Sequence, residues 1–501
     1  MFRLARRRAL RFRLRHEPRI LASLLSTSVP TVSQPVIPAD LAEWCSANDD
    51  RAQSELFEFL RIPSVSAKSE HKQDCLAAAQ FVADALTRIG LTTELVSTPG
   101  HPIVVGEWRQ AGPAAPTLLI YGHYDVQPPE PLELWTSPAF EPTVRDGRIY
   151  ARGSVDDKGQ LYLHIKAIEA HLAVRGTLPV NVIVLAEGEE EVGSVHLEEF
   201  LEREKQRLAC DAVVISDSTM FAPGIPSILS SLRGLAYVQI DVRGADSDLH
   251  SGMYGGAVVN PAMALARILA TMHDADGRIT IAGFYDRVRP FPDAVREQMR
   301  ALPFSDDGLM HEVGVTALAG EPGYTTLERL WTRPTCEVNG LLSGYTGEGA
   351  KTVLPAISMA KVSFRLVPDQ EPSTIERLVT EHIARVTPPG VSATVTALHG
   401  GRPWRADLQG PIYEAGKRAL EAAFGRAPVI TGEGGSIPVV GDFERILGAP
   451  VLLMGFGLPG ENAHAPNEWI SVENYRLGIR ACATLLEEAG LQLQLKDRNR
   501  S

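Results

Sequence analysis

Continuous apolar runs recur along the chain, and each ends at a glycine or a polar residue. Four of them lie within residues 118–121, 181–186, 211–216 and 450–454. Runs without alternation are typical of parallel strands that helices cover on both faces. The pattern predicts an α/β domain in which a mostly parallel sheet is flanked by helices.

Helices are expected around these strands. After a proline-bearing linker at residues 30–38, Asp40 is suited to cap a helix that continues towards Leu60. Residues 74–89 carry apolar positions at helical spacing and end at Gly90, a common C-terminal stop.

The middle of the chain alternates instead. Residues 237–243 and 361–366 place apolar side chains on one face and polar side chains on the other, as in half-exposed antiparallel strands. Helices are expected from Asn260 and over residues 373–386. We therefore expect an α+β domain inserted at about residues 226–399.

The segments 39–225 and 400–501 would together form the α/β domain. A chain of 501 residues that is 44% hydrophobic is long enough for two or three domains. Residues 1–38 would be a basic extension, because residues 1–16 hold seven arginines and no acid. That start fits a transit peptide, a basic arm or a disordered extension. We interpret it as disordered, with organelle targeting as the second interpretation.

Charge and cysteine usage exclude several classes of protein. The net charge is -12, and beyond residue 16 the chain carries 42 basic against 61 acidic residues, so we expect no nucleic-acid partner. No apolar run approaches the roughly 18 to 20 residues of a membrane span. The five cysteines are scattered and odd in number. They argue against a disulfide framework or a thiolate zinc site, and for a reducing, cytoplasmic compartment.

The first residues with metal-binding chemistry follow the run at 118–121. In an extended segment His123 and Asp125 point the same way, so the carboxylate can orient an imidazole that binds a metal. Taken alone, the pair also fits a surface or capping pair. Asp156 and Asp157 follow a glycine-containing turn and precede an apolar-periodic helix. One acid can cap that helix while its neighbour binds a metal.

Three further strand ends offer ligands. Residues 187–191 are rich in glutamate, Asp217 follows the run at 211–216, and His464 comes after the last run. Separately they fit a solvated loop, an Asx turn and a structural histidine. Together they favour a shared metal site, because the strand ends of an open parallel sheet line one crevice. The combined set of His, Asp, Glu, Asp and His suits zinc, manganese or cobalt.

Seven motifs carry a resemblance that runs in order from about residue 40 to residue 490. They are Gly122-His123-Tyr124-Asp125-Val126-Gln127-Pro128, Gly153-Ser154-Val155-Asp156-Asp157-Lys158-Gly159, Glu190-Glu191-Val192-Gly193-Ser194, Ser216-Asp217, Asp248-Leu249-His250-Ser251-Gly252, Lys351-Thr352-Val353-Leu354-Pro355 and Glu433-Gly434-Gly435-Ser436-Ile437-Pro438. The chain thereby resembles the carnosinase and cytosolic nonspecific dipeptidase branch of the co-catalytic metallopeptidases. That family also includes carboxypeptidase G-type enzymes, aminoacylase and succinyl-diaminopimelate desuccinylase.

The resemblance implies a catalytic α/β domain and an inserted lid and dimerisation domain. It implies two divalent ions per subunit, zinc or manganese, with cobalt as a third option. His123, Asp156 and Asp217 would hold one ion. Asp156, Glu191 and His464 would hold the other, so that Asp156 bridges the two.

The resemblance also implies the reaction, which is hydrolysis of the peptide bond of dipeptides by a metal-bridged water without a covalent intermediate. Glu190 would be the general base and Asp125 the residue that orients His123. The choice of Glu190 follows the Glu-Glu-x-Gly register, and a slip to Glu189 stays open. The peptide bond between Asp156 and Asp157 would be cis.

Substrate contacts are implied as well. His250 of the inserted domain would act in the active site of the other subunit of a homodimer. Thr352, Arg365 and Ser436 would bind the substrate, with Arg365 clamping a carboxylate bidentately. From the sequence alone, His250 also fits a turn beside Gly252, and Arg365 fits a surface salt bridge.

Three alternatives remain. An N-acyl-amino-acid deacylase or desuccinylase of the same family would use the same metals, although the motifs around His250, Thr352 and Ser436 favour a dipeptidase. A dinuclear phosphoesterase fits the ligand types, but the sequence has no glycine-rich phosphate loop. A non-catalytic peptide-binding homologue would have lost a ligand or the base, and every such position is filled here.

Overall fold

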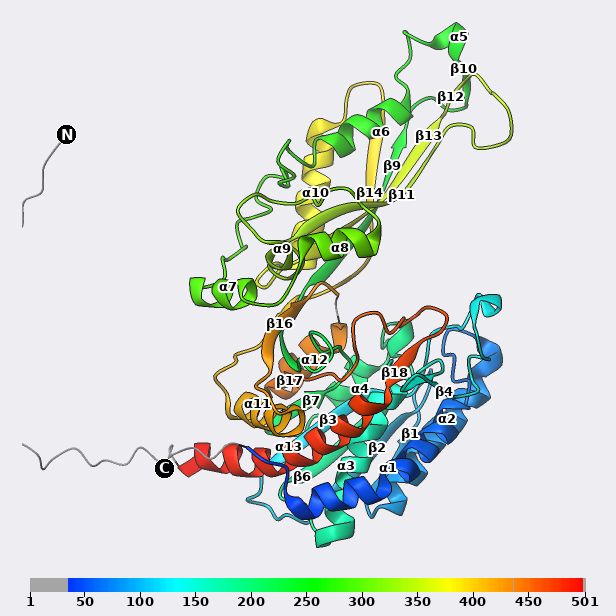
Figure 1. Ribbon diagram of the computed structural model, residues 1–501. Coiled ribbons are helices and arrows are strands. Elements are labelled where there is room, and N and C mark those ends of the chain that lie inside the picture. Colours follow the sequence, from blue (N-terminus) through cyan, green and yellow to red (C-terminus); the bar gives the residue numbers. More distant parts are fainter. Residues whose placement is uncertain (1–34, 436, 499–501) are drawn as a thin grey trace, which may run out of the picture. The chain divides into compact units, whose positions relative to one another are not determined.

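The computed structural model describes residues 35–435 and 437–498 (Figure 1). Residues 1–34, which make up most of the expected basic extension, lie outside the described residues. Ser436 lies outside them too. In the described part of the chain, no helix combines the length and the apolar character that crossing a bilayer requires.

A nine-stranded mixed sheet is the largest element of the fold (Figure 1). Its strands in spatial order are β1 (Thr92–Val96), β2 (Ile103–Trp108), β6 (Asn181–Glu187), β3 (Thr117–His123), β7 (Ala212–Ile215), β17 (Val451–Leu453), β8 (Ser227–Leu232) and β15 (Trp404–Arg405), with β16 (Val429–Glu433) paired to β8. The four predicted apolar runs form the central strands β6, β3, β7 and β17, which are parallel. Antiparallel strands flank this centre. The predicted α/β fold is confirmed.

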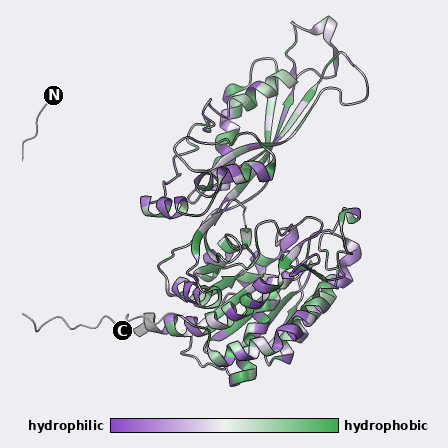
Figure 2. Cartoon of the chain, viewed as in Figure 1, coloured by the Kyte–Doolittle hydropathy of each residue, from purple (hydrophilic) through white to green (hydrophobic). Residues whose placement is uncertain are grey.

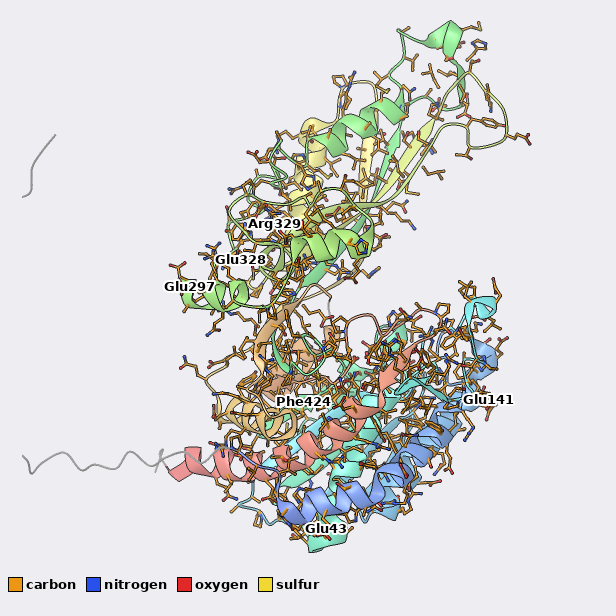
Figure 3. All side chains as sticks on the ribbon, in the orientation of Figure 1. Glu43, Glu141, Glu297, Glu328, Arg329 and Phe424 are labelled. Atoms are coloured by element: carbon orange, nitrogen blue, oxygen red, sulfur yellow. The ribbon has the colours of Figure 1, made fainter. Side chains whose placement is uncertain are left out.

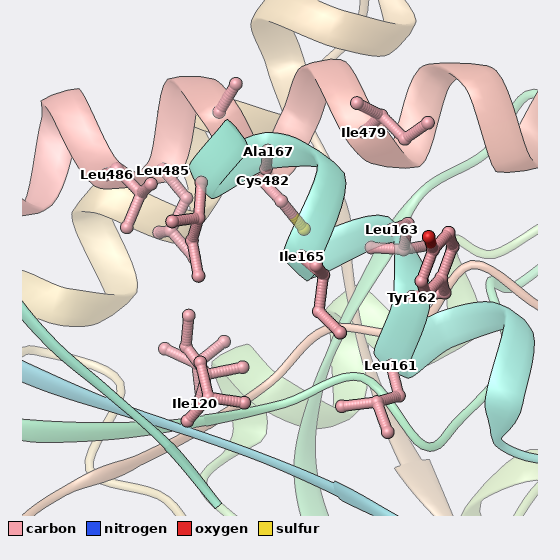
Figure 4. Close-up of a cluster of buried hydrophobic side chains, with 14 of the residues drawn as sticks. Ile120, Leu161, Tyr162, Leu163, Ile165, Ala167, Ile479, Cys482, Leu485 and Leu486 are labelled. Atoms are coloured by element: carbon pink, nitrogen blue, oxygen red, sulfur yellow. The ribbon is translucent and has the colours of Figure 1, made fainter. Parts of the chain in front are cut away.

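Helices cover both faces of this sheet, because successive side chains of each strand point to opposite sides. Leu118 and Ile120 pack with one set of helices, whereas Leu119 and Tyr121 pack with the other. The first set is α1 (Ala39–Leu60), α2 (Lys72–Arg88), α3 (Lys158–Arg175), α11 (Pro411–Phe424) and α13 (Val472–Arg498), and the second is α4 (Leu197–Arg203) and α12 (Pro438–Leu447). Figure 2 shows hydrophobic residues gathered on the central strands, and Figure 4 shows α3 and α13 packed over Ile120.

The start of α1 differs from the prediction. The helix begins at Ala39, so Asp40 lies inside the first turn instead of at the cap. Its carboxylate forms an ion pair with Arg175 of α3, with 2.8 Å between the nearest nitrogen and oxygen. The prediction that Asp40 caps the helix is therefore wrong, because a tertiary partner engages the side chain.

A separate four-stranded antiparallel sheet follows β8. Its strands in spatial order are β11 (Thr335–Ser343), β13 (Ile357–Leu366), β9 (Gly234–Arg243) and β14 (Ser392–Gly401). Val238 and Ile240 of β9 are buried, and they pack with α6 (Pro261–Ala270) and α10 (Pro372–Val386). The alternating pattern thus predicted this half-exposed sheet correctly.

Short elements complete this part of the chain. They are β10 (Leu249–His250), β12 (Val353–Leu354), α5 (Ser251–Tyr254), α7 (Asp293–Arg300), α8 (Asp306–Val313) and α9 (Thr326–Thr332). A capping box between Thr325 and Glu328 starts α9, where Figure 3 labels Glu328 and Arg329. The expected insertion boundary at residue 226 precedes β8, which pairs within the nine-stranded sheet. The division into domains stays a prediction.

A small three-stranded sheet lies next to the site described below. It joins β4 (Thr143–Arg145) and β5 (Arg148–Tyr150) to β18 (Trp469–Ser471), with Tyr150 opposite Trp469. The pairing of β5 with β18 thereby places the segment after Tyr150 next to the segment before Trp469.

Candidate active site

The predicted ligands converge where the central parallel strands end. His123 is the last residue of β3, and Asp217 lies just beyond β7. A cavity of about 340 Å³ opens here, and its lining includes Asp156, Glu190 and His464. That volume falls within the range typical of small-molecule sites.

His123 is completely buried and has a defined orientation. Its Nδ1 lies 3.1 Å from the backbone carbonyl oxygen of Asp125 and 3.4 Å from the Asp125 carboxylate. The other carboxylate oxygen of Asp125 accepts a hydrogen bond of 3.2 Å from the backbone N–H of Glu191. The ring therefore turns its Nε2 away from Asp125 and towards the acids of the cavity.

Two groups of potential metal ligands share Asp156. The Nε2 atom of His123 lies 3.2 Å from one Asp156 oxygen and 3.8 Å from Asp217. The Nε2 atom of His464 lies 2.9 Å from the other Asp156 oxygen and 3.3 Å from Glu191. One carboxylate thus faces both histidines, as a bridging ligand must.

The turn before α3 presents Asp156 and Asp157 differently. The peptide bond between them is cis, as the resemblance implied. Asp157 occupies the N-cap position of α3, but its side chain accepts a hydrogen bond of 3.2 Å from the backbone N–H of His123 instead of a helix donor. Asp156 therefore faces the cavity, whereas Asp157 fixes the backbone of His123.

The run of glutamates after β6 separates into three environments. Glu189 lies 2.7 Å from Nδ1 of His196, outside the cavity lining. Glu190 lines the cavity. Glu191 accepts hydrogen bonds from Gln127, of 3.1 Å from its backbone N–H and 2.8 Å from its side-chain amide. Glu190 therefore lies at the cavity and Glu191 lies among the potential metal ligands, whereas Glu189 is in neither set.

Burial and mutual proximity perturb these groups. Burial raises the pKa of Asp217, and the neighbouring Asp156 adds to the rise. Burial also raises the pKa of Glu190 against the effect of His123. Hydrogen bonds to Asp156 and Glu191 raise the pKa of His464 to about 10. Against the effect of burial, hydrogen bonds to His123 and His464 hold the pKa of Asp156 below its usual range. Without cations, Glu190, Asp217 and His464 therefore hold their protons more tightly than isolated groups would, whereas Asp156 stays ionised between the two histidines.

The donor set fits divalent cations. Nε2 of His123 is buried and has no hydrogen-bond partner among the described residues. It faces carboxylates of two residues, and a matching imidazole faces Asp156 from the other side. Imidazole nitrogens and carboxylate oxygens without a thiolate suit zinc, manganese and cobalt. The residues thus provide candidate ligands for two divalent metal ions.

The predicted substrate contacts lie elsewhere. His250 is exposed, and its Nδ1 accepts a hydrogen bond of 3.0 Å from the backbone N–H of Gly252. Thr352 is exposed next to it, and Arg365 lies half-buried on β13. None of these residues is among the lining residues of the cavity in the described part of this chain. Ser436 lies outside the described residues.

Several residues around the cavity carried no role in the sequence analysis. Glu433 lines the cavity, and burial raises its pKa. Gln127 holds Glu191, and Arg152 forms a buried ion pair with Glu468. In the sequence, Gln127 lies four residues after His123 and Glu468 lies four residues after His464, and this position does not identify a partner.

Comparisons with known proteins agree with this geometry. A family model described as Peptidase family M20/M25/M40 matches residues 119–488. Cys-Gly metallodipeptidase dug1 of Schizosaccharomyces pombe is 35% identical over 464 residues, which cover 89% of this chain and 97% of that protein. The human Beta-Ala-His dipeptidase is 31% identical over 91% of this chain and 93% of its own length. The M20 family metallo-carboxypeptidase Sso-CP2 from Sulfolobus solfataricus has a TM-score of 0.79 at 34% identity, covering 88% of this chain and 99% of that structure.

The fold and the paired ligand groups define a metallopeptidase, a hydrolase that acts on peptide bonds. This chain belongs to the peptidase family M20/M25/M40. The family that the motifs indicated is therefore confirmed, and two of the relatives carry names of the dipeptidase branch.

We expect cation affinity at the Asp156, Glu191 and His464 group to rise with pH. His464 is protonated up to its raised pKa of about 10, and a cation must displace that proton. One released proton makes the affinity rise by about tenfold per pH unit below that pKa. Titration calorimetry with Zn²⁺ or Mn²⁺ at about pH 6 and about pH 8 measures the change. The His464→Ala variant should lose this dependence, and equal affinities at both pH values in the unaltered protein would contradict the assignment.

Proposed function

We propose that this enzyme hydrolyses the peptide bond of dipeptides with two divalent cations, zinc or manganese, with cobalt as a further option. The observation that carries the proposal is Asp156, which faces both His123 and His464 at the edge of a cavity that Glu190 also lines. The relatives support the substrate class, because two of them are named as dipeptidases.

Each ligand group would hold one cation. His123, Asp156 and Asp217 form the first group, and Asp156, Glu191 and His464 form the second. When bound, the cations supply a water of lowered pKa and polarise the scissile carbonyl. The residues around them keep the ligands in place: Asp125 orients the ring of His123, and Gln127 holds the carboxylate of Glu191.

Glu190 is suited to move the proton. Its carboxylate would accept a proton from the attacking water and pass it to the nitrogen of the leaving amine. Burial raises its pKa, which favours proton uptake by this carboxylate over an exposed one. Glu189 is engaged by His196 and does not line the cavity, so it is less suited to that role.

His250, Thr352, Arg365 and Ser436 are proposed to bind the substrate. His250 is exposed on β10, and Thr352 is exposed just before the neighbouring strand β12. We propose that His250 reaches the site of a second subunit in a homodimer, where its imidazole would stabilise the oxyanion of the tetrahedral intermediate. Arg365 would clamp the C-terminal carboxylate of the substrate. A clamp of this kind favours dipeptides over long chains.

An N-acyl-amino-acid deacylase or desuccinylase is the second candidate, since it would use the same ligands. A non-catalytic peptide-binding homologue is less favoured, because both ligand groups and Glu190 are present. We propose a cytoplasmic location, which the five free cysteines support, and neither a nucleic-acid nor a membrane partner.

We expect unblocked dipeptides to be the preferred substrates. Cys-Gly and β-Ala-His, each compared with its N-acetylated form in the presence of Zn²⁺ or Mn²⁺, provide matched pairs. The free dipeptides should show a kcat/KM at least about tenfold higher, because two relatives are named as dipeptidases for these substrates. Faster cleavage of N-acyl amino acids would point to the deacylase, and no turnover of either class would contradict the enzyme proposal.

Glu190→Gln should reduce kcat by about 10² to 10⁴ while both cations stay bound, because the amide accepts no proton. Glu189→Gln is the matched control, since the same atom is changed one residue away and the side chain faces His196. Kinetics combined with metal analysis of both variants checks this. Full activity of Glu190→Gln with loss in Glu189→Gln would show that the register is shifted.

His250→Ala should be inactive alone, but active when mixed with Glu190→Gln. In a mixed dimer one site has an intact Glu190 and receives His250 from the other chain. Random exchange should restore about a quarter of the unaltered activity, because half of the dimers then carry one complete site. If the mixture stays inactive although subunit exchange is demonstrated, His250 does not act across the interface.

A further inference from the structure

A completely buried ion pair joins two segments that carry metal ligands. Nη1 of Arg152 lies 2.7 Å from Oε2 of Glu468, and the two side chains are 1% and 0% exposed. Arg152 precedes the turn that presents Asp156, and Glu468 follows the loop that presents His464. The two partners are 316 residues apart in the sequence.

The small three-stranded sheet brings them together. Tyr150 at the end of β5 pairs with Trp469 at the start of β18. The backbone N–H of Ala151 extends this ladder by donating to the carbonyl oxygen of Glu468 over 3.1 Å. Arg152 is therefore the second residue beyond β5, and its side chain meets that of Glu468.

The carboxylate of Glu468 fixes the turn that leads to Asp156. Oε2 accepts the backbone N–H of Gly153 at 2.9 Å in addition to Arg152. Oε1 accepts the backbone N–H groups of Val155 at 2.9 Å and Asp156 at 3.1 Å. Hydrogen bonds to a charged acceptor are the strong ones, and four of them converge on this buried group.

The guanidinium of Arg152 reaches the remaining segments. Its Nη2 donates to the carbonyl oxygen of Ala465 at 3.3 Å and to that of Pro128 at 3.4 Å. Ala465 follows His464, and Pro128 follows Gln127, the residue that holds Glu191. The ion pair thus contacts the segments of Asp156 and His464 directly, and it contacts the segment of Gln127, which in turn holds Glu191.

We propose that Arg152 and Glu468 are positioning residues that set the spacing of Asp156, Glu191 and His464, so that this group binds its cation tightly. The inference rests on the metal centre of the proposed function. Glu468 also holds the backbone of Asp156, which both groups share, so the first group is affected as well. His123 and Asp217 receive no contact from either residue among the described hydrogen bonds and ion pairs, whereas the segment of His464 does, so the effect is larger on the second group.

A purely stabilising role does not account for the pair. A buried ion pair gains little over apolar residues of similar size, because both charges lose their hydration. What apolar residues cannot replace is the set of fixed hydrogen bonds to three backbone segments. Outer partners that fix ligands in this way change metal affinity by about 10- to 100-fold when altered.

Glu468→Gln tests the proposal, because the amide keeps the shape but turns its NH2 donor either towards Arg152 and Gly153 or towards Val155 and Asp156. Titration calorimetry of the metal-free protein should show one cation bound about 10- to 100-fold more weakly and the other, which shares only Asp156, weakened less. The weakened cation should be the one whose affinity His464→Ala also reduces. Excess metal should then restore the kcat of Glu468→Gln, which a merely structural defect would not allow.

Glu488→Gln is the matched control, since Glu488 is also largely buried in an ion pair, 2.7 Å from Arg418, on α13. It should leave both affinities unchanged. The proposal is overturned if Glu468→Gln binds both cations like the unaltered protein, or if Glu488→Gln causes the same loss. Should Glu468→Gln not fold, Arg152→Lys keeps the charge but loses the fork to Pro128 and Ala465, and the same asymmetric loss decides the matter.

Turnover of dipeptides by the unaltered protein separates this inference from the proposed function. Asymmetric cation loss without any dipeptide turnover would retain the positioning role and reject the dipeptidase. Turnover with symmetric or unchanged cation binding would retain the dipeptidase and reject the positioning role.

Discussion

Negative charge concentrated in a buried place is the constraint on which the rest of the site depends. Asp156, Glu190, Glu191 and Asp217 converge at one cavity edge, and the histidines face them from two sides. Carboxylates so close together, with little water around them, repel one another unless they keep protons or bind cations. Without cations, the raised pKa values of Glu190 and Asp217 keep protons on these carboxyl groups, which reduces the repulsion. Bound divalent ions would reduce the same repulsion by supplying positive charge. A catalytic cavity built in this way is poised for metal binding before any ligand arrives.

Such a cluster of carboxylates needs a rigid scaffold that keeps the ligand side chains in fixed positions. The parallel strands β3 and β7 deliver His123 and Asp217 from the core of the sheet, where both faces are packed. Asp156 and His464 come from loops, and loops alone position side chains poorly. The buried pair of Arg152 and Glu468 compensates by tying those loops to each other. Sheet and ion pair thus perform the same task by different physical means.

Much of this arrangement was readable from local patterns. The apolar runs predicted the parallel strands, and the position of His123 and Asp217 after such runs predicted their convergence, since strand ends share one edge. The pair of Arg152 and Glu468 could not be predicted, because it depends on β5 meeting β18 across most of the chain. The prediction that Asp40 caps α1 was wrong for a related reason, because its side chain pairs with Arg175, which is distant in the sequence. The strand β8 was missed because its sequence, SILSSL, mixes apolar and polar residues without either period.

The position of β17 has a consequence for biosynthesis. This strand lies between β7 and β8, yet it is encoded after the four-stranded sheet has been made. Until the ribosome has added β17, the facing edges of β7 and β8 have unpaired backbone groups, and such edges promote aggregation. The nine-stranded sheet can therefore be completed only after β17 has been synthesised. A truncated product without β17 would keep these edges exposed and would be expected to bind chaperones.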